Sequence, residues 1–370
     1  MSQTSNNLFL TISDTAATTT AGAKAKIPTW LPWLSGRLFS GLFVILVISF
    51  IVFGATQALP SDPARIILGP EASEKSIAIL REQLGLNKPI YIQYLHWTEN
   101  ILSGDLGRSI DSQVEVSSII KARFGNTLVL ALIVAAFSIP LAIISGIFLA
   151  LRRDTPIDRL TISCLVLVKA VPGFVLAIWL VMLLSTSVFP VLPAASLLDP
   201  NKSAFTQMQY LILPALTLGL SVTPYLLRLV RSSMIEAMES DYVIAARLRG
   251  IPESNIIWYH ALPNALIPTI QGIAMTFRFL LSGVVLIEVV FSYPGIGNAL
   301  NAAIETRDIP MIQSTVLLLT LGVVVINLLA DFITLLLTPK LRTSTPRIKS
   351  RKIKISEKKF DAEKPVRKVS

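Results

Sequence analysis

The sequence predicts an all-α, polytopic membrane protein with about six transmembrane helices. Hydrophobic residues make up 52% of the 370-residue chain and charged residues only 15%, which is too little polar surface for a water-soluble fold of this size. The apolar residues are gathered into long blocks, as a lipid environment requires. Of the 33 Lys and Arg residues, 12 lie between Lys340 and Lys368, after the last block. A cationic tail beside a membrane span predicts contact with membrane lipid and not with nucleic acid.

Six blocks are long enough to cross the hydrocarbon core, since a spanning helix takes roughly 20 apolar residues. In chain order they are 38–59, 127–151, 160–189, 209–227, 266–291 and 309–339. We expect the third span to break near Pro172, because proline lacks the N–H that an unbroken helix needs. The first block is longer than the core of a signal peptide, so we expect an uncleaved span.

Basic residues predict the orientation, because short cytoplasmic loops collect Lys and Arg. The turn 152–159 carries three arginines, and the stretch after the fourth block carries four. The segments 190–208 and 292–308, on the other side, carry one basic residue each. Both termini are therefore expected in the cytoplasm.

The chain is expected to have three parts. Residues 1–37 are rich in Ser, Thr and Ala and predict a disordered cytoplasmic extension. Residues 38–343 form the membrane domain, with an outer loop at 60–126, and residues 344–370 form a basic cytoplasmic tail.

The outer loop is itself predicted to be helical. Ser73 is suited to cap a helix over 73–84 that Gly85 ends. A second helix is predicted where apolar residues recur at helical spacing, at Ile90, Tyr94, Trp97 and Ile101. These helices indicate an amphipathic cap on the outer membrane face, with a dedicated docking surface as the alternative.

The cytoplasmic loop 231–265 is the most informative part of the chain. Its stretch EAMESDYVIAARLRGIPESNIIWYHALPNALIPTI predicts a short helix, a turn at Gly250 and a second helix that enters the membrane. Ala245 and Ala246 on the first helix would let a partner approach closely. Arg247 and Arg249 would add charge-assisted contacts at the rim.

Here the chain resembles the permease subunits of ABC importers, whose loop carries Glu-Ala-Ala, three residues, Gly, nine residues, Ile, one residue and Leu-Pro. The residues that match at the right spacing are Ala245, Ala246, Gly250, Leu262 and Pro263. Ile244 stands in place of Glu and His260 in place of Ile. With Asp241, Tyr242 and Arg247, the loop is similar to the peptide-importer branch, in which DYV…AR…G and HAL.NAL are typical.

The likeness covers residues 38–343. Several segments along this range resemble those of the dipeptide, oligopeptide and nickel permease family. The similar segments are LPSDPARIILG (59–69), QLGLNKPIYIQYLHW (83–97), GDLGRSI (104–110), FSYPGIGNALNAAI (291–304) and LADFITLLLTPKLR (329–342).

The resemblance implies a type I ABC importer permease in the plasma membrane of a bacterium, that is, its inner membrane. The implied partners are an extracytoplasmic solute-binding protein, a second homologous permease subunit and two ATP-binding subunits that receive the loop as a coupling helix. The chain has no GxxxxGK[ST] phosphate loop, so ATP and Mg are expected on the partner subunits. We expect no catalytic residue and no cofactor in this chain.

Four ionisable residues inside the spans are candidate functional residues, because an unpaired charge in a membrane is costly. They are Lys169, Arg278, Glu288 and Asp331. Three interpretations stay open. The four pair with one another inside the bundle, some of them line the solute path, or Glu288 and Asp331 lie near the outer and inner ends respectively, where water reaches them. Lys169 is the best candidate for the path, since it lies deep in a span.

The expected solutes are di- or oligopeptides, and the alternatives are a nickel complex or a peptide-like compound. An ion-coupled secondary transporter is the alternative from another class, although its usual internal repeat is not evident. Cys164 and two distant histidines do not predict a metal site.

Overall fold

The computed structural model describes residues 30–58, 63–69, 71–83, 85–186, 189–199, 202 and 204–337. Within these ranges the chain is helical, and its β-structure is limited to one isolated bridge between Arg108 and Glu115. Five helices are long and apolar enough to cross a membrane. They are α1 (Trp30–Gln57), α5 (Val116–Leu151), α8 (Ile212–Met238), α11 (Leu262–Val290, continuous with the residues that precede it) and α13 (Ile309–Leu337).

A bent pair of helices supplies the sixth predicted span. Helix α6 (Pro156–Ala170) and the segment 173–186, which comprises α7 (Gly173–Val181) and a π-helical turn, meet at 97°. Val171 between them has φ −81° and ψ 128°, an extended conformation that the following Pro172 favours. The predicted break near Pro172 is confirmed, and so is the all-α, polytopic fold with about six spans.

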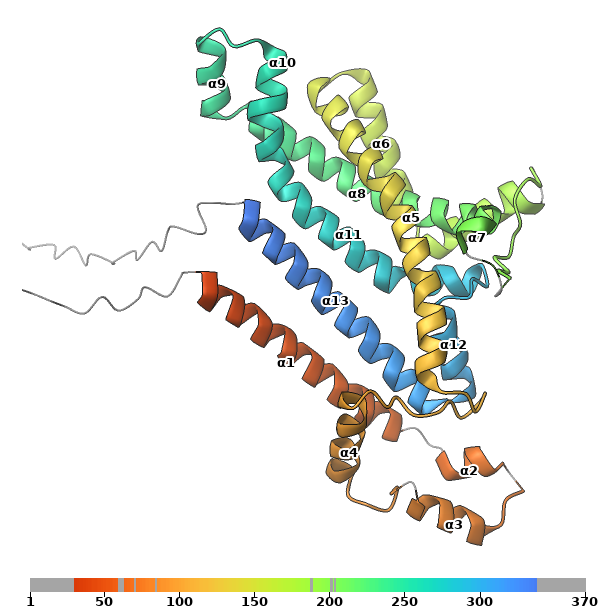
Figure 1. The fold of residues 1–370 in the computed structure, drawn as a ribbon. Helices are drawn as coiled ribbons and strands as arrows, with labels where there is room; N and C mark the ends of the chain where they lie inside the picture. The colour runs from red at the N-terminus through yellow and green to blue at the C-terminus, as the bar shows by residue number, and fades with distance from the viewer. Residues whose placement is uncertain are drawn as a thin grey trace, which may run out of the picture.

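Helices α5, α8 and α11 form the centre of the bundle (Figure 1). Small residues let these helices approach closely, as is common between membrane helices. A β-carbon at Gly146 of α5 would lie 2.8 Å from Val230 of α8, and one at Gly272 of α11 would lie 2.2 Å from Leu229. These glycines therefore set the spacing of the three helices.

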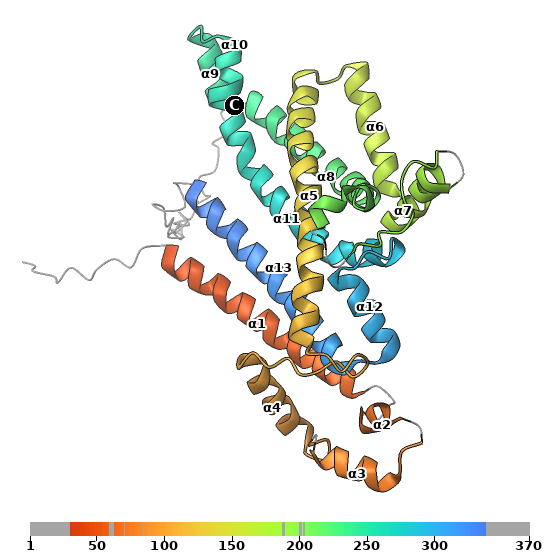
Figure 2. The same ribbon diagram turned by 45° about the vertical axis from the view of Figure 1, so that its right-hand side comes forward.

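Helices α1 and α13 lie side by side along one flank of the bundle (Figures 1 and 2). Large apolar side chains of α1, including Phe39, Phe43 and Phe50, are exposed in the single chain. Helix α1 begins at Trp30, so residues 30–37 belong to the first helix and not to the predicted extension. The rest of that extension, residues 1–29, and the basic tail 344–370 lie outside the described residues.

The segment after α1 forms a helical cap, as predicted, with α2 (Pro63–Leu68), α3 (Glu74–Gln83) and α4 (Ile90–Leu102). Ser73 caps α3 by accepting a hydrogen bond from the Ser76 N–H at 3.2 Å, and Gly85 follows with φ +66°.

Aromatic side chains anchor the cap to α1. The rings of Tyr94 and Trp97 each lie with their centroids 5.4 Å from that of Phe53. The hydroxyls of Tyr94 and Ser49 are 2.7 Å apart. The cap is therefore packed on the bundle through the apolar face that the sequence pattern predicts.

The two ends of the bundle differ in what they carry. The cap and α12 (Ile296–Thr306) lie at one end (Figures 1 and 2). The turn between α5 and α6 and the short helix α9 (Asp241–Leu248) lie at the other end. The described ends of α1 and α13, at residues 30 and 337, lie next to each other and point away from the cap.

Candidate functional site

The loop between α8 and α11 has the helix–turn–helix form that the sequence predicts. Helix α9 begins after Ser240, whose φ of −72° and ψ of 151° break the helix from α8. Asp241 lies exposed in its first turn, where a negative charge is favourable. After the turn, α10 (Glu253–Asn255) and a π-helical turn (Ile256–Ala261) lead into α11 at Leu262 and Pro263.

Gly250 ends α9 in the manner predicted for a turn glycine. Its φ is +74°, the left-handed region that glycine enters without strain. The Gly250 N–H donates to the Arg247 carbonyl at 2.9 Å, and the Ile251 N–H donates to the Ala246 carbonyl at 3.3 Å. A β-carbon at Gly250 would meet no atom within 4 Å, so its requirement is conformational and not steric.

The inner face of α9 packs on its own chain. Ala246 is buried together with Val243, and both lie against a cluster that includes Met234 and Ile256. In the single chain Ala246 therefore faces inward, and its contact with a partner stays a prediction. Ala245 is half-buried.

The outward face of the loop carries large apolar side chains, of which the sequence analysis had singled out only Tyr242. Leu248 is 84% exposed and Tyr259 76% exposed, and Tyr242, Ile244 and Trp258 are exposed with them. A signal was present in the sequence, because Ile244 and Leu248 lie one helical turn apart on the face opposite Val243. A surface of exposed aromatic and aliphatic side chains is suited to bind another protein.

Arg247 forms an ion pair within the loop. Its Nη2 and Nε donate to the two carboxylate oxygens of Glu253 at 2.6 and 3.1 Å. The Glu253 carboxylate raises the pKa of Arg247. The pair bridges the turn at Gly250 and joins α9 to α10. The Arg247 side chain is still 44% exposed, and its contact at a partner's rim stays a prediction.

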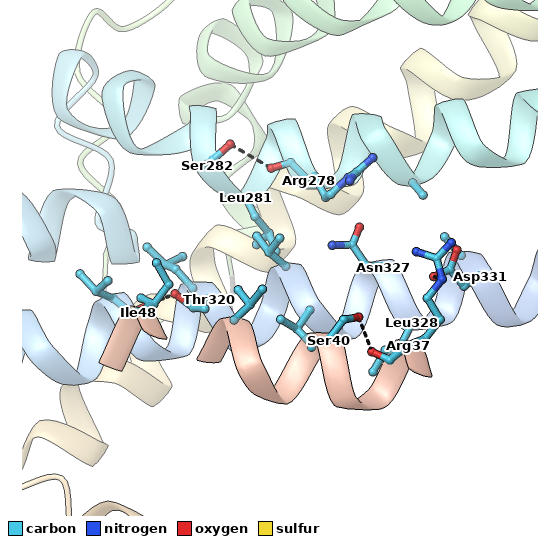
Figure 3. Close-up of a pocket in the computed structure, with 18 of the residues that line it drawn as sticks. Arg37, Ser40, Ile48, Arg278, Leu281, Ser282, Thr320, Asn327, Leu328 and Asp331 are labelled. Atoms are coloured by element: carbon cyan, nitrogen blue, oxygen red, sulfur yellow. Dashed lines mark hydrogen bonds and ion pairs between the residues drawn. The ribbon is translucent and has the colours of Figure 1, made fainter. Parts of the chain in front are cut away.

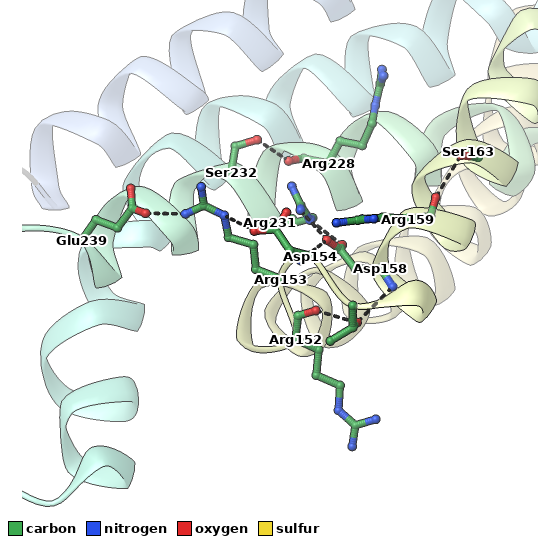
Figure 4. A network of polar contacts seen from close by, with 11 residues as sticks. Arg152, Arg153, Asp154, Asp158, Arg159, Ser163, Arg228, Arg231, Ser232 and Glu239 are labelled. Atoms are coloured by element: carbon green, nitrogen blue, oxygen red, sulfur yellow. Dashed lines mark hydrogen bonds and ion pairs between the residues drawn. The ribbon is translucent and has the colours of Figure 1, made fainter.

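A second ionic network ties the α5–α6 turn to α8 (Figure 4). The Arg231 guanidinium donates to both carboxylate oxygens of Asp158, at 2.7 and 2.6 Å. Asp158 is only 2% exposed, and it also accepts a hydrogen bond from the Asp154 N–H at 3.0 Å. In the sequence analysis Arg231 was counted only as one of the basic residues that predict orientation, and its pairing with Asp158 was not predicted.

The same turn is also joined to the start of the loop. Arg153 forms an ion pair with Glu239, which directly precedes the N-cap Ser240 of α9 (Figure 4). Ion pairs thus connect the α5–α6 turn and the start of α6 to α8 and to the residue that follows it, just before α9 begins.

The four intramembrane charges do not pair with one another, so that interpretation is wrong for the residues that the structure describes. Asp331 forms an ion pair with Arg37 of α1, with 3.3 Å between carboxylate oxygen and Nε. Glu288 accepts hydrogen bonds from the Thr127 hydroxyl at 2.6 Å and the Gly297 N–H at 2.7 Å.

Glu288 is part of a buried junction between α5, α11 and α12. Thr127 of α5 donates to Glu288 and accepts from the Ile296 N–H at 2.8 Å. Gly295 and Gly297 come so close that a β-carbon would lie 2.0 Å and 2.9 Å from carboxylate oxygens of Glu288. The Pro-Gly turn after the fifth span therefore has a structural role.

A groove of about 820 Å³ separates the α1–α13 pair from α11 (Figure 3). Arg278 of α11 and Asn327 of α13 border it from opposite sides, and the Arg37–Asp331 pair lies at one end. Arg278 also lines a smaller cavity of about 470 Å³, to which Lys169 contributes.

Comparisons with known proteins identify the family. Residues 138–343 match the model of the binding-protein-dependent transport system inner membrane component, and residues 30–131 match the N-terminal model of the corresponding membrane component. The chain belongs to this family. It is a membrane-embedded permease subunit of an ABC importer, and as a transport component it is not itself an enzyme.

Individual relatives agree with the family assignment. The permease is 34% identical to the glutathione transport system permease protein GsiC of Escherichia coli strain K12 over 314 residues, 84% of this chain and 99% of the relative. It is 35% identical to GsiC of Salmonella typhimurium with the same coverage. A solved structure of the MetNI methionine ABC transporter in an inward-facing conformation matches 60% of this chain and 96% of that chain, at 16% identity and a TM-score of 0.47.

Proposed function

We propose that this permease imports di- or short oligopeptides and that the loop between α8 and α11 couples it to an ATPase subunit. The single observation that supports the solute class is the likeness, over 99% of their length, to permeases named for glutathione, itself a tripeptide. A nickel complex or another peptide-like compound is the alternative. Family membership sets aside the ion-coupled secondary transporter.

The proposed assembly contains a second homologous permease subunit, two ATP-binding subunits and an extracytoplasmic binding protein. ATP and Mg are bound by the ATP-binding subunits. The exposed apolar face of the loop, with Leu248 at its centre, is suited to enter a groove on one ATPase subunit. Closure of the ATPases on ATP would move α9 and rock the bundle between inward-open and outward-open packings.

In this proposal the permease lies in a bacterial inner membrane, with α9 and the α5–α6 turn in the cytoplasm. The described ends of α1 and α13 lie on the same side as α9, which supports cytoplasmic termini. The cap α2–α4 and α12 then face the binding protein.

Co-purification of the complete complex tests the coupling surface. Leu248→Asp is expected to reduce the bound ATPase about tenfold, because it places a charge in an apolar interface. Leu102→Asp is the matched control, since Leu102 is an 82% exposed leucine at the end of α4, in the cap at the opposite end of the bundle. Equal loss in both variants, or in neither, would contradict the proposed coupling surface.

ATP-driven uptake into liposomes tests the solute class. The complex is supplied with saturating binding protein loaded with a labelled dipeptide, glutathione or a nickel chelate. Uptake of the peptides supports the proposal, and uptake of nickel alone overturns it.

A further inference from the structure

The cavity between α6, α8 and α11 brings two cationic side chains together inside the membrane domain. Lys169 is near the end of α6, and Arg278 is in the middle of α11. Both line the same cavity of about 470 Å³. The other polar groups on its wall are hydroxyls, from Ser221, Tyr225, Thr276 and Ser282.

Both cations lie far along their helices from the end at which each helix begins. Lys169 follows Pro156, the start of α6, by 13 residues, which corresponds to about 20 Å at 1.5 Å per residue. Arg278 follows Leu262, the start of α11, by 16 residues, or about 24 Å. In a hydrocarbon core about 30 Å thick, neither side chain is at the surface where α6 and α11 begin.

No described acidic side chain balances these charges. The Lys169 amino group donates to the Ser221 carbonyl at 3.2 Å and lies 5.1 Å from the centroid of the Phe279 ring. Arg278 has no ion pair with a described residue, and no carboxylate lines the cavity among the residues that the structure describes. The two acids in the spans are bound elsewhere, Glu288 at α12 and Asp331 at Arg37.

We propose that Lys169 and Arg278 form a transient binding site for a carboxylate of the transported solute. The proposal rests on the proposed peptide function, because every peptide with an unmodified end carries a carboxylate. Arginine binds a carboxylate through its planar fork and lysine as a point charge. The four hydroxyls already donate to backbone carbonyls or to the Met275 sulfur, so they would have to rotate before they could donate to a solute.

The rest of the wall is suited to side chains of many kinds. Val222, Met275 and Phe279 are apolar and offer contact without specific hydrogen bonds. Methionine adapts to ligands of different shape. The site therefore recognises the carboxylate that all the peptides share and does not discriminate between their side chains.

The cavity shares two of its lining residues with the neighbouring groove. Arg278 and Ser282 line both this cavity and the 820 Å³ groove beside α1 and α13. A carboxylate held by Lys169 on one side of α11 can be passed to Arg278, which borders the other side as well.

The test compares transport of a dipeptide with that of its C-terminal amide, in liposomes that hold the complete complex. Each peptide is delivered by binding protein at saturating concentration, and the rate per complex is measured. We expect Lys169→Gln and Arg278→Gln to slow transport of the free dipeptide about tenfold, since one charge-assisted contact is lost. Transport of the amide should change less than twofold, so the preference for the carboxylate disappears.

Charge-conserving variants separate a solute site from a structural role. Lys169→Arg and Arg278→Lys should keep most of the preference. If the Gln variants slow both peptides equally, or if they fail to assemble with the second permease, the cations pair with that subunit and the proposal is overturned. If they lose co-purified anionic phospholipid while the preference stays, the ligand is a lipid phosphate and the proposal is likewise overturned.

The same experiment distinguishes a failure of the peptide function itself. If the unaltered complex transports neither peptide but does transport a nickel chelate, the proposed peptide function is wrong, and the proposed carboxylate site is wrong as well. If it transports both peptides at equal rates, the peptide function stands and only the carboxylate site is wrong.

Discussion

Two buried carboxylates at opposite ends of the bundle are stabilised in different ways. Asp158, near the α5–α6 turn, meets the guanidinium of Arg231, which remains about a fifth exposed. Glu288, at the far end of α11, is 0% exposed and meets a hydroxyl and backbone N–H groups at the start of α12. Asp158 is therefore stabilised by a full positive charge, whereas Glu288 is stabilised by the dipoles of hydroxyl and backbone N–H groups.

The difference follows from the surroundings of each carboxylate. A guanidinium at the end of a span still reaches water, so its desolvation is partial. A second full charge beside Glu288 would have to be buried completely, whereas helix N-terminal N–H groups bring partial positive charge at no such cost. An ion pair between side chains can re-form after small movements, while contacts with backbone groups hold one arrangement. We therefore expect substitutions at the two ends to differ in how much they destabilise the bundle.

The largest effect is expected at the end of the bundle that carries α12, from Gly295→Ala. The new β-carbon would lie 2.0 Å from a Glu288 oxygen and must displace the carboxylate from its donors. Because the fully buried carboxyl group would lose its hydrogen-bond donors and the bundle must take up the steric overlap, we expect a loss of about 3–5 kcal/mol in the free energy of unfolding. Thermal unfolding of the purified complex in detergent measures it.

Two further variants check the cause. Gly125→Ala, on α5 beside the same junction, is the control, because a β-carbon there meets no atom within 4 Å. Glu288→Ala removes the group with which the new methyl collides, so Gly295→Ala should cost much less in that background. Additive losses would show that Glu288 is not the reason.

A smaller effect is expected at the end of the bundle that carries α9, from Asp158→Asn. The amide keeps the size of the side chain but removes the charge that Arg231 binds through two hydrogen bonds. We expect a loss of about 2 kcal/mol, less than for a fully buried pair, because water reaches the guanidinium. Asp154→Asn on the same turn is the control, since that side chain is exposed and solvent screens its ion pair with Arg153. A loss as large as that of Gly295→Ala would contradict the proposed difference between the ends.

The smallest effect is expected from Arg153→Gln, which removes the ion pairs of Arg153 with Glu239 and with Asp154. All three side chains are about half exposed or more, so solvent screens both pairs and their loss should cost about 0.5–1 kcal/mol. A salt titration of the unaltered complex should show the same small contribution fading at high ionic strength. A loss above about 2 kcal/mol would mean that these pairs are as important as the buried one.

Local patterns in the sequence were sufficient to predict most of the fold. The apolar blocks predicted the spanning helices, Pro172 the break, Ser73 and Gly85 the limits of α3, and Gly250 the end of α9. Each of these features depends on side chains within one helical turn or on the conformation of one residue. The first helix was predicted to begin too late, because residues 30–37 are less apolar than the block that follows.

The partners of the charges were decided by the tertiary structure alone. Thr127 is 161 residues from Glu288, and Arg231 is 73 residues from Asp158, so no local spacing indicates either contact. The same holds for α9, whose pattern predicted a helix but not that Ala246 would turn inward onto Met234 and Ile256. Hydropathy depends on the composition of one segment, whereas the pairing of buried polar groups depends on which segments the bundle brings within about 3 Å of each other.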